Sequence, residues 1–509
     1  MTKPASATAA ADPRAIAGGG AAGYDRAFFG HPRGLSTLFF TEMWERFSYY
    51  GMRALLLLFM TAPVASGGLG FSAAQGGAIY ALYTSMVYMM TLPGGWVADR
   101  FIGQRRAVLY GGILIASGHF SMAVPALATF YLGLFLIVVG TGLLKGNVSV
   151  MVGYLYGKED IRRDAGFSLF YMGINLGAFF APLICGYLGQ NVNWHLGFAS
   201  AGVGMLFGLV QYVAGGRYLG EAGLEPAPAE SPEAAATLRR RSIVLGSLVA
   251  AAITLFAIGT FAGVLSVSAT QVADAAGYFL LILTLGFFAW LFGSGGWTPE
   301  ERRRLYAIGA LFLAAAIFWS VFEQAGSTLN LFADRNTNNV LLGFPFPSSW
   351  FQSQNSLFLW ILAPLFAWLW LRLGAHGHEP SSPAKFAMSL IFAGAGFAIL
   401  ILPARQLAQV SPMWLTMTYV LHTIGELLLS PVGLSAMTKL APGRIAGLVM
   451  GIWFLATSVG NYIGGRVSGF YESFPLPSLF GAVATFSVVA GLVMFAVTPP
   501  IKRMMGRVN

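Results

Sequence analysis

Residues 127–152 read LATFYLGLFLIVVGTGLLKGNVSVMV, an apolar run in which Lys145 is the only charged side chain. A helix needs about 20 apolar residues to cross a bilayer, so this run predicts a transmembrane helix. The whole chain has the same character, because 56% of its 509 residues are apolar and 10% are charged. Soluble proteins carry about 25% charged residues. The composition therefore excludes a cytosolic protein, and it also excludes a disordered one, which would lack apolar surface to bury.

Thirteen further apolar segments surround this run, and together they predict fourteen transmembrane helices. Gly occurs 64 times, which favours close helix packing in lipid. The predicted spans are 35–61, 72–97, 105–125, 127–152, 165–189, 195–219, 242–265, 274–293, 303–331, 350–373, 385–403, 412–438, 445–469 and 478–498.

The distribution of Lys and Arg predicts the orientation of these spans. If both chain ends are cytoplasmic, 24 of the 30 basic residues fall in cytoplasmic segments and three, Arg335, Arg405 and Arg466, fall outside. This asymmetry is typical of inner-membrane proteins, in which cytoplasmic loops are basic. It also accounts for the net charge of +10 without nucleic acid, because the basic residues face the anionic cytoplasmic leaflet.

The spans divide into two bundles of six with two helices inserted between them. A Pro-, Ala- and Glu-rich segment without aromatic residues follows the sixth span and is typical of a linker. The predicted parts are a disordered cytoplasmic tail (1–34), the first bundle (35–219), a cytoplasmic linker (220–241), two inserted transmembrane helices (242–300), the second bundle (301–500) and a cytoplasmic tail (501–509).

Seven charged residues lie in the interior of the predicted spans, away from their ends, where each costs about 2.5–3.5 kcal/mol to insert. Such residues mark functional sites by default, although ion pairs that only fix helix packing are the alternative. The seven are Glu42, Glu45, Arg46, Arg53, Lys145, Glu323 and Glu426.

The first span, TEMWERFSYYGMR, concentrates four of these charges. Glu42, Arg46, Tyr49 and Arg53 recur at helical spacing and fall within about 60° of one another on one face. Glu42 and Arg46 are expected to pair along the helix. A carboxylate that loses such a partner in an apolar site takes up a proton, so this stripe predicts a proton-binding switch.

The charges of the two bundles are opposite in sign, +1 in the first and −2 in the second. Ion pairs between the bundles would suit the gates of an alternating-access transporter. A zwitterion would fit between them, with its carboxylate on the cations and its ammonium on a glutamate. Aromatic side chains are expected either to line its side-chain pockets or to anchor the helices in lipid: Tyr50, Tyr88, Trp319, Trp453 and Phe454.

Two groups of motifs are similar to known families. GGWVADRFIGQRR (94–106) resembles the loop motif of the major facilitator superfamily. In that motif Gly95 would let helices approach, Asp99 would pair with an arginine, and Arg100, Gly103 and Arg105 complete the pattern. A second group of motifs resembles the proton-dependent oligopeptide transporters, bacterial branch, and the resemblance covers nearly the whole chain. These motifs are Glu42-Met-Trp-Glu45-Arg46-Phe47 with Tyr49-Tyr50-Gly51, FSLFYMGINLGAFFAP (167–182) and GELLLSPVG around Glu426.

The resemblance implies a role for each matching residue. Glu42, Glu45, Arg46 and Glu323 would couple transport to protons. Arg53–Glu323 and Lys145–Glu426 would be gating ion pairs. Peptide-contacting positions would be Arg46, Tyr50, Arg53, Tyr88, Lys145, Asn175, Trp319, Glu323, Asn355, Glu426, Trp453 and Phe454. The second span has no histidine, unlike the animal members, so proton coupling would rest on carboxylates.

We therefore expect an all-α integral membrane protein with a major facilitator fold, which acts as a proton-coupled importer of di- and tripeptides in a cell inner membrane. The same fold with another substrate, such as nitrate or an amphipathic drug, is the first alternative, and a channel or a membrane enzyme is the second. No nucleophile constellation or metal-ligand spacing is apparent in the sequence. We expect no enzyme activity and no cofactor or metal, with protons, peptides and lipid as the partners of a monomer.

Overall fold

The computed structural model describes residues 25–157, 160–226 and 231–506. Most of the predicted N-terminal tail, residues 227–230 of the predicted linker and the last three residues lie outside the described residues. The first bundle comprises α3 (Arg33–Thr61), α4 (Ala73–Met89) with its continuation α5 (Thr91–Val97), α6 (Gln104–Met122), α7 (Leu127–Tyr154), α8 (Arg163–Tyr187) and α9 (Trp194–Gly215).

Two helices, α10 (Pro232–Phe261) and α11 (Ala269–Gly293), follow the first bundle. The second bundle then comprises α12 (Pro299–Phe322), α13 (Thr328–Arg335), α14 (Ser353–Ala375), α15 (Ser382–Ala398), α16 (Met413–Leu440), α17 (Val449–Ser468) and α18 (Leu476–Ala496), and the short α19 (Thr498–Met505) ends it. A small antiparallel hairpin of β1 (Val340–Leu341) and β2 (Phe344–Pro345) lies between α13 and α14.

Ten helical segments in the described part of the chain are long and apolar enough to cross a bilayer. Four other long segments, α3, α4 with α5, α6 and α17, bring the total to the predicted fourteen. The charges of α3, Arg105 and Arg106 at the start of α6, and Asn461 and Arg466 of α17 lower the hydropathy of these helices, and α4 has only 17 residues before α5 begins. The predicted all-α membrane fold with six, two and six spans is confirmed.

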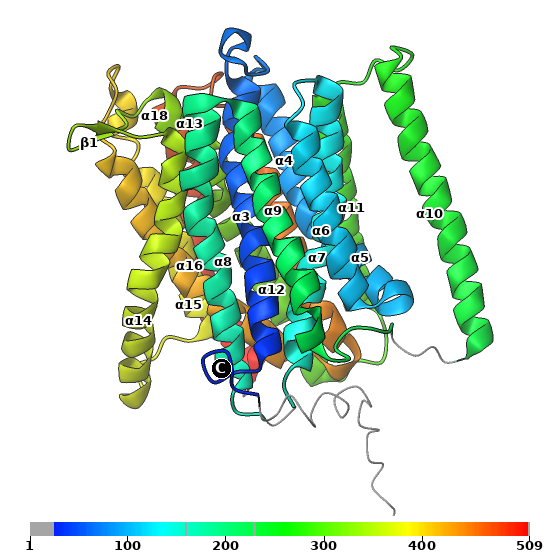
Figure 1. Ribbon diagram of the computed structural model, residues 1–509. Helices are drawn as coiled ribbons and strands as arrows, with labels where there is room; N and C mark the ends of the chain where they lie inside the picture. Colours follow the sequence, from blue (N-terminus) through cyan, green and yellow to red (C-terminus); the bar gives the residue numbers. More distant parts are fainter. Residues whose placement is uncertain (1–24, 158–159, 227–230, 507–509) are drawn as a thin grey trace, which may run out of the picture.

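The start of α3 and α19, the last described helix, lie at the same end of the molecule (Figure 1). Arg302, Arg303 and Lys502 also lie at this end, which we call the Arg-rich end. The opposite end, which we call the far end, carries the turns after α3 and α17.

Two helix packings show why glycine is used inside spans. A Cβ on Gly111 of α6 or on Gly140 of α7 would lie 2.6 Å from the other residue's carbonyl oxygen, so α6 and α7 are in backbone contact. Between the bundles, a Cβ on Gly465 of α17 would lie 2.5 Å from the Cα of Ala81 of α4. The far half of the bundle interface is therefore closed by backbone contact that a larger residue would prevent.

The inserted helices differ from each other in packing. α11 packs against α4, α12 and α17, and so touches both bundles. α10 stands apart from the rest of the molecule (Figure 1), and its central apolar residues are exposed, as expected of a helix that faces lipid. α10 already begins at Pro232, so its first turns occupy the segment 220–241 that was expected to be linker. Proline is favoured at the first helical position, which explains the earlier start.

Candidate functional site

The charged stripe of α3 lies inside the protein. Glu42, Glu45 and Arg46 are each no more than 2% exposed. Arg46 holds Glu45 with two nitrogens: its Nη2 donates to Oε1 at 2.6 Å, and its Nε contacts Oε2. Glu42 also pairs with Arg46, as predicted from the spacing, but its Oε1 is 3.4 Å from Nε and its Oε2 has no hydrogen-bond partner. Two carboxylates therefore share one guanidinium, and Glu42 is the less firmly held of the two.

Arg53 joins the two bundles about 10 Å beyond Arg46 along α3. Its Nη2 lies 2.7 Å from Oε2 of Glu323, and its Nε donates to the hydroxyl of Tyr80 on α4 at 3.0 Å. Glu323 can reach Arg53 because α12 ends at Phe322 and a short 3₁₀ turn, Glu323–Gly326, separates it from α13. The structure thus places the predicted Arg53–Glu323 pair in contact, buried on both sides.

The predicted Lys145–Glu426 pair is not formed. No ion pair among the described residues joins the two side chains. The ammonium of Lys145 on α7 lies 3.9 Å from the ring centroid of Tyr88. Glu426 on α16 instead accepts a hydrogen bond from Nδ2 of Asn355 on α14 at 2.9 Å. Each charge has a partner within its own bundle here, and the gating role of the Lys145–Glu426 pair stays a prediction.

The remaining predicted contact positions fall on both sides of the bundle interface. Tyr88 and Phe454 face each other across it, with ring centroids 6.4 Å apart. Tyr50 lies against the guanidinium of Arg53, 5.7 Å from ring centroid to Cζ. Asn175 makes a local bond from Nδ2 to the carbonyl of Tyr171 at 3.1 Å, and it does not meet Glu426. In the second bundle Trp319 packs on Phe318 and Phe322, and Trp453 packs over Gly433.

Six of these side chains are partly exposed, whereas the charged residues of α3 are buried. The six are Tyr50, Lys145, Trp319, Asn355, Glu426 and Phe454.

The loop motif after α5 is built differently from the expectation. A Cβ on Gly95 would touch nothing within 4 Å, whereas Gly94 packs against the backbone of Gly142 on α7. Asp99 accepts a hydrogen bond from Gln104 Nε2 at 2.6 Å, and among the described residues it pairs with no arginine. The expectations for Gly95 and Asp99 are therefore wrong, because α5 turns its neighbouring glycine to α7 and Gln104 caps the carboxylate.

The rest of that motif ties α6 to the chain after α9. Gly103 has φ +77°, a conformation that favours glycine, and a Cβ there would strike the carbonyls of Gly223 and Leu224. Arg105 donates to the carbonyl of Gly220 at 2.9 Å and to that of Gly216. Arg100 is exposed and forms no ion pair among the residues that the structure describes.

Sequence reasoning missed several polar contacts between the bundles at the far end. Asn330 of α13 donates to the carbonyl of Ala54 at 2.8 Å. The side-chain amide of Gln190 donates to Ser348 Oγ at 2.8 Å and accepts from the backbone N of Ser349 at 3.0 Å. These residues carry no motif, and Tyr80 likewise has no sequence signal that would link it to Arg53. Only the packing of distant helices reveals them.

The model of the POT family matches residues 105–489 of this chain. This chain belongs to the POT family. Two similar curated relatives are the peptide transporter YePEPT of Yersinia enterocolitica, 42% identical with 94% of this chain and 96% of the relative covered, and the di-/tripeptide transporter of Lactococcus lactis subsp. cremoris, 39% identical with 95% and 99% covered.

A solved structure of a POT peptide transporter in complex with sulfate has the same fold. It is 44% identical, covers 95% of this chain and 98% of its own, and superposes with a TM-score of 0.88. The family assignment and the major facilitator fold are therefore confirmed. POT members are multi-pass membrane transporters.

Proposed function

We propose that this protein imports di- and tripeptides together with protons, by alternating access, across a bacterial inner membrane with its Arg-rich end in the cytoplasm. The proposal rests on two charged pairs, of which one is in contact and the other is not. Arg53 and Glu323 are in contact near the far end, whereas Lys145 and Glu426 are apart and partly exposed. This is the pattern expected of a molecule that is closed to the outside and in which Lys145 and Glu426 are not paired with each other.

The chemistry of Lys145 and Glu426 suits a peptide. Lys145 on the first bundle can hold a carboxylate, and Glu426 on the second bundle can hold an ammonium. Every peptide carries both groups at its termini, so binding through them tolerates many side chains. The names of relatives that act on di- and tripeptides support this substrate class.

Proton coupling is assigned to the carboxylates around Arg46. The described charges between the bundles, Glu42, Glu45, Arg46, Arg53, Lys145, Glu323 and Glu426, sum to −1. A neutral zwitterion leaves this charge unchanged, and one proton cancels it. Glu42 is the group we assign as the first acceptor, because its Oε2 has no partner while Glu45 is held at both oxygens. The proton would add about 2.3 kcal/mol of driving force per 100 mV.

The test is dialanine uptake into proteoliposomes with and without an inward proton gradient. Wild-type protein should accumulate dialanine only with the gradient. Glu42→Gln should lose gradient-driven accumulation and keep dialanine exchange, while the exposed Glu472→Gln serves as the matched control and keeps both. Accumulation that is indifferent to the proton gradient in active preparations would refute the coupling. Saturable uptake of nitrate or a drug that dialanine does not inhibit would refute the substrate.

A further inference from the structure

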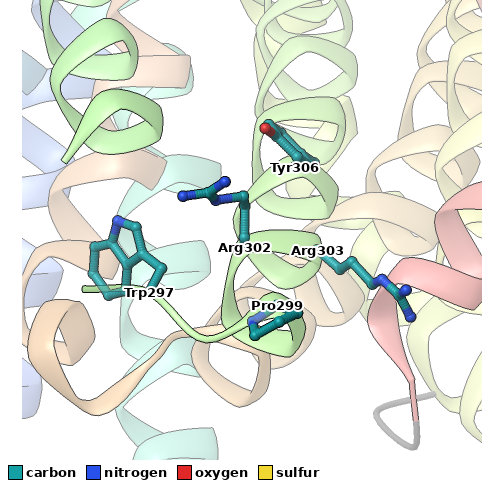
Figure 2. A pocket seen from close by; sticks show the side chains of 5 residues that line it. All are labelled: Trp297, Pro299, Arg302, Arg303 and Tyr306. Atoms are coloured by element: carbon teal, nitrogen blue, oxygen red, sulfur yellow. The ribbon is translucent and has the colours of Figure 1, made fainter. Parts of the chain in front are cut away.

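A surface cavity of about 290 Å³ lies at the start of α12, at the Arg-rich end. It is lined by the loop before α12 and by the first two turns of that helix: Trp297, Pro299, Arg302, Arg303 and Tyr306. Figure 2 shows Arg302 pointing toward Trp297, while Arg303 points to the opposite side, toward α19.

The charge of this cavity is not neutralised by the protein. Arg302 and Arg303 are exposed, and neither takes part in an ion pair among the described residues. The two nearest carboxylates are engaged elsewhere. Glu300 pairs with Arg304 at 2.5 Å, and Glu301 accepts from the N and Oγ of Thr298 at 2.9 and 3.0 Å. Basic Lys502 of α19, a helix that packs against α12, adds to the excess of positive charge.

The aromatic walls of the cavity are held in place. Trp297 donates from Nε1 to the carbonyl of Leu291 at 3.1 Å and to Ser294 Oγ at 2.9 Å, and Arg444 stacks on its ring 4.5 Å from the centroid. Tyr306 lies 5.2 Å from the ring of Phe292. Trp and Tyr are the residues that gather at the level of lipid headgroups. The position and the composition of the cavity thus agree with the membrane surface.

One face of α12 continues the cavity toward the middle of the membrane. Arg302, Tyr306 and Leu313 are spaced four and seven residues apart, which places them within about 60° on the helix. Tyr306 is 45% exposed and Leu313 is 59% exposed. Between them, Gly309 packs against Phe292 of α11, whose Cζ lies 3.1 Å from where a Cβ on Gly309 would be. From Arg302 to Leu313 is about 16 Å along the axis, roughly half the thickness of the hydrocarbon core.

We propose that this cavity binds the phosphodiester headgroup of an anionic phospholipid, with the acyl chains lying along the exposed face of α12. Arg302, which points into the cavity toward Trp297, supplies charge-assisted hydrogen bonds to the phosphate, and Arg303 adds positive charge from the opposite side. Tyr306 lies at the glycerol level, and an acyl chain would reach the exposed Leu313. A free phosphate would use the arginines alone. The order of charged, aromatic and apolar groups along one face favours the lipid.

The test is native mass spectrometry of the full-length protein in detergent, titrated with dioleoyl-phosphatidylglycerol or dioleoyl-phosphatidylcholine. Wild-type protein should bind one phosphatidylglycerol about tenfold more tightly than phosphatidylcholine. The double variant Arg302→Gln/Arg303→Gln should bind both lipids within about twofold. The control is Arg239→Gln/Arg240→Gln, which removes the same amount of charge from α10 at the Arg-rich end. This variant should behave as wild type. All proteins are compared at equal monodispersity and equal dialanine uptake.

Three outcomes would overturn the proposal. Equal affinity of wild-type protein for the two lipids would show that no anion is selected. Equal loss of binding in both double variants would show a diffuse effect of surface charge. Complete displacement of the lipid by 10-fold excess inorganic phosphate or glycerol phosphate would assign the cavity to a free phosphate. The lipid site is supported if neither compound displaces the lipid and if only Arg302→Gln/Arg303→Gln loses the preference for phosphatidylglycerol.

Discussion

Removing the charge of Glu323 should open the far end of the protein. Arg53 and Glu323 are about 4–6% exposed and only 2.7 Å apart, and breaking one side of such a buried pair costs about 3–5 kcal/mol. If the far end of the wild-type protein is closed in about 99% of molecules, a change of 3 kcal/mol lowers that share to about 40%. Glu323→Gln should therefore turn a minor open state into the major one.

Double electron–electron resonance between labels at the far end measures this change. Val64→Cys, after α3, and Leu407→Cys, before α16, place labels at exposed positions on the two bundles. The native Cys185 is the only cysteine and is buried, so it should stay unlabelled. The control is Glu472→Gln, which breaks an exposed ion pair with Arg335 at the same end and should shift the equilibrium by less than about 1 kcal/mol. An unchanged distance distribution in folded Glu323→Gln would refute the reasoning.

Three further changes have expected outcomes. Lys145→Gln should weaken dialanine binding at least about tenfold, because a charge-assisted hydrogen bond to the peptide is lost. Lys145→Arg should retain part of the affinity. Equal affinity of Lys145→Gln and wild type for dialanine, measured by calorimetry, would contradict this. Gly465→Val should destabilise far-end closure by about 1–3 kcal/mol, seen as a longer distance between the same labels, because its Cβ would strike Ala81. Burial alone would raise the pKa of Glu472, but bonds from the backbone N of Ala73 and from Arg335 outweigh it and lower the pKa. Its contribution to closure should thus be full above about pH 4.5 and fade as the pH falls through the lowered pKa, and Glu472→Gln should abolish that pH dependence.

Local patterns in the sequence predicted the helices and the stripe on α3, because both depend on hydropathy and on a 3.6-residue period. The pairing of Glu42 with Arg46 followed from the same period. The second partner of Arg46, Glu45, did not follow, because adjacent residues point apart on an ideal helix and only the bend of a long side chain brings them together.

Contacts between distant helices were beyond the reach of local patterns. Lys145 and Glu426 have opposite charges, but whether they meet depends on the conformation of the whole molecule, and here Tyr88 and Asn355 are their partners. Gly95 and Gly94 are indistinguishable by composition, yet the rotation of α5 sets only Gly94 against α7. The role of Tyr80 beside Arg53 depends in the same way on the placement of α4.

The packing of α11 limits how the two bundles can separate. Its Asp274 pairs with Arg466 of α17 at 2.9 Å, and its Ala273 carbonyl accepts from Tyr462 at 2.9 Å, whereas among described residues no ion pair ties it to α4. When the far end opens, α11 should therefore move together with the second bundle and slide along α4. Because α10 stands apart from the rest of the molecule and a short turn joins it to α11, it would let α11 move without displacing the first bundle.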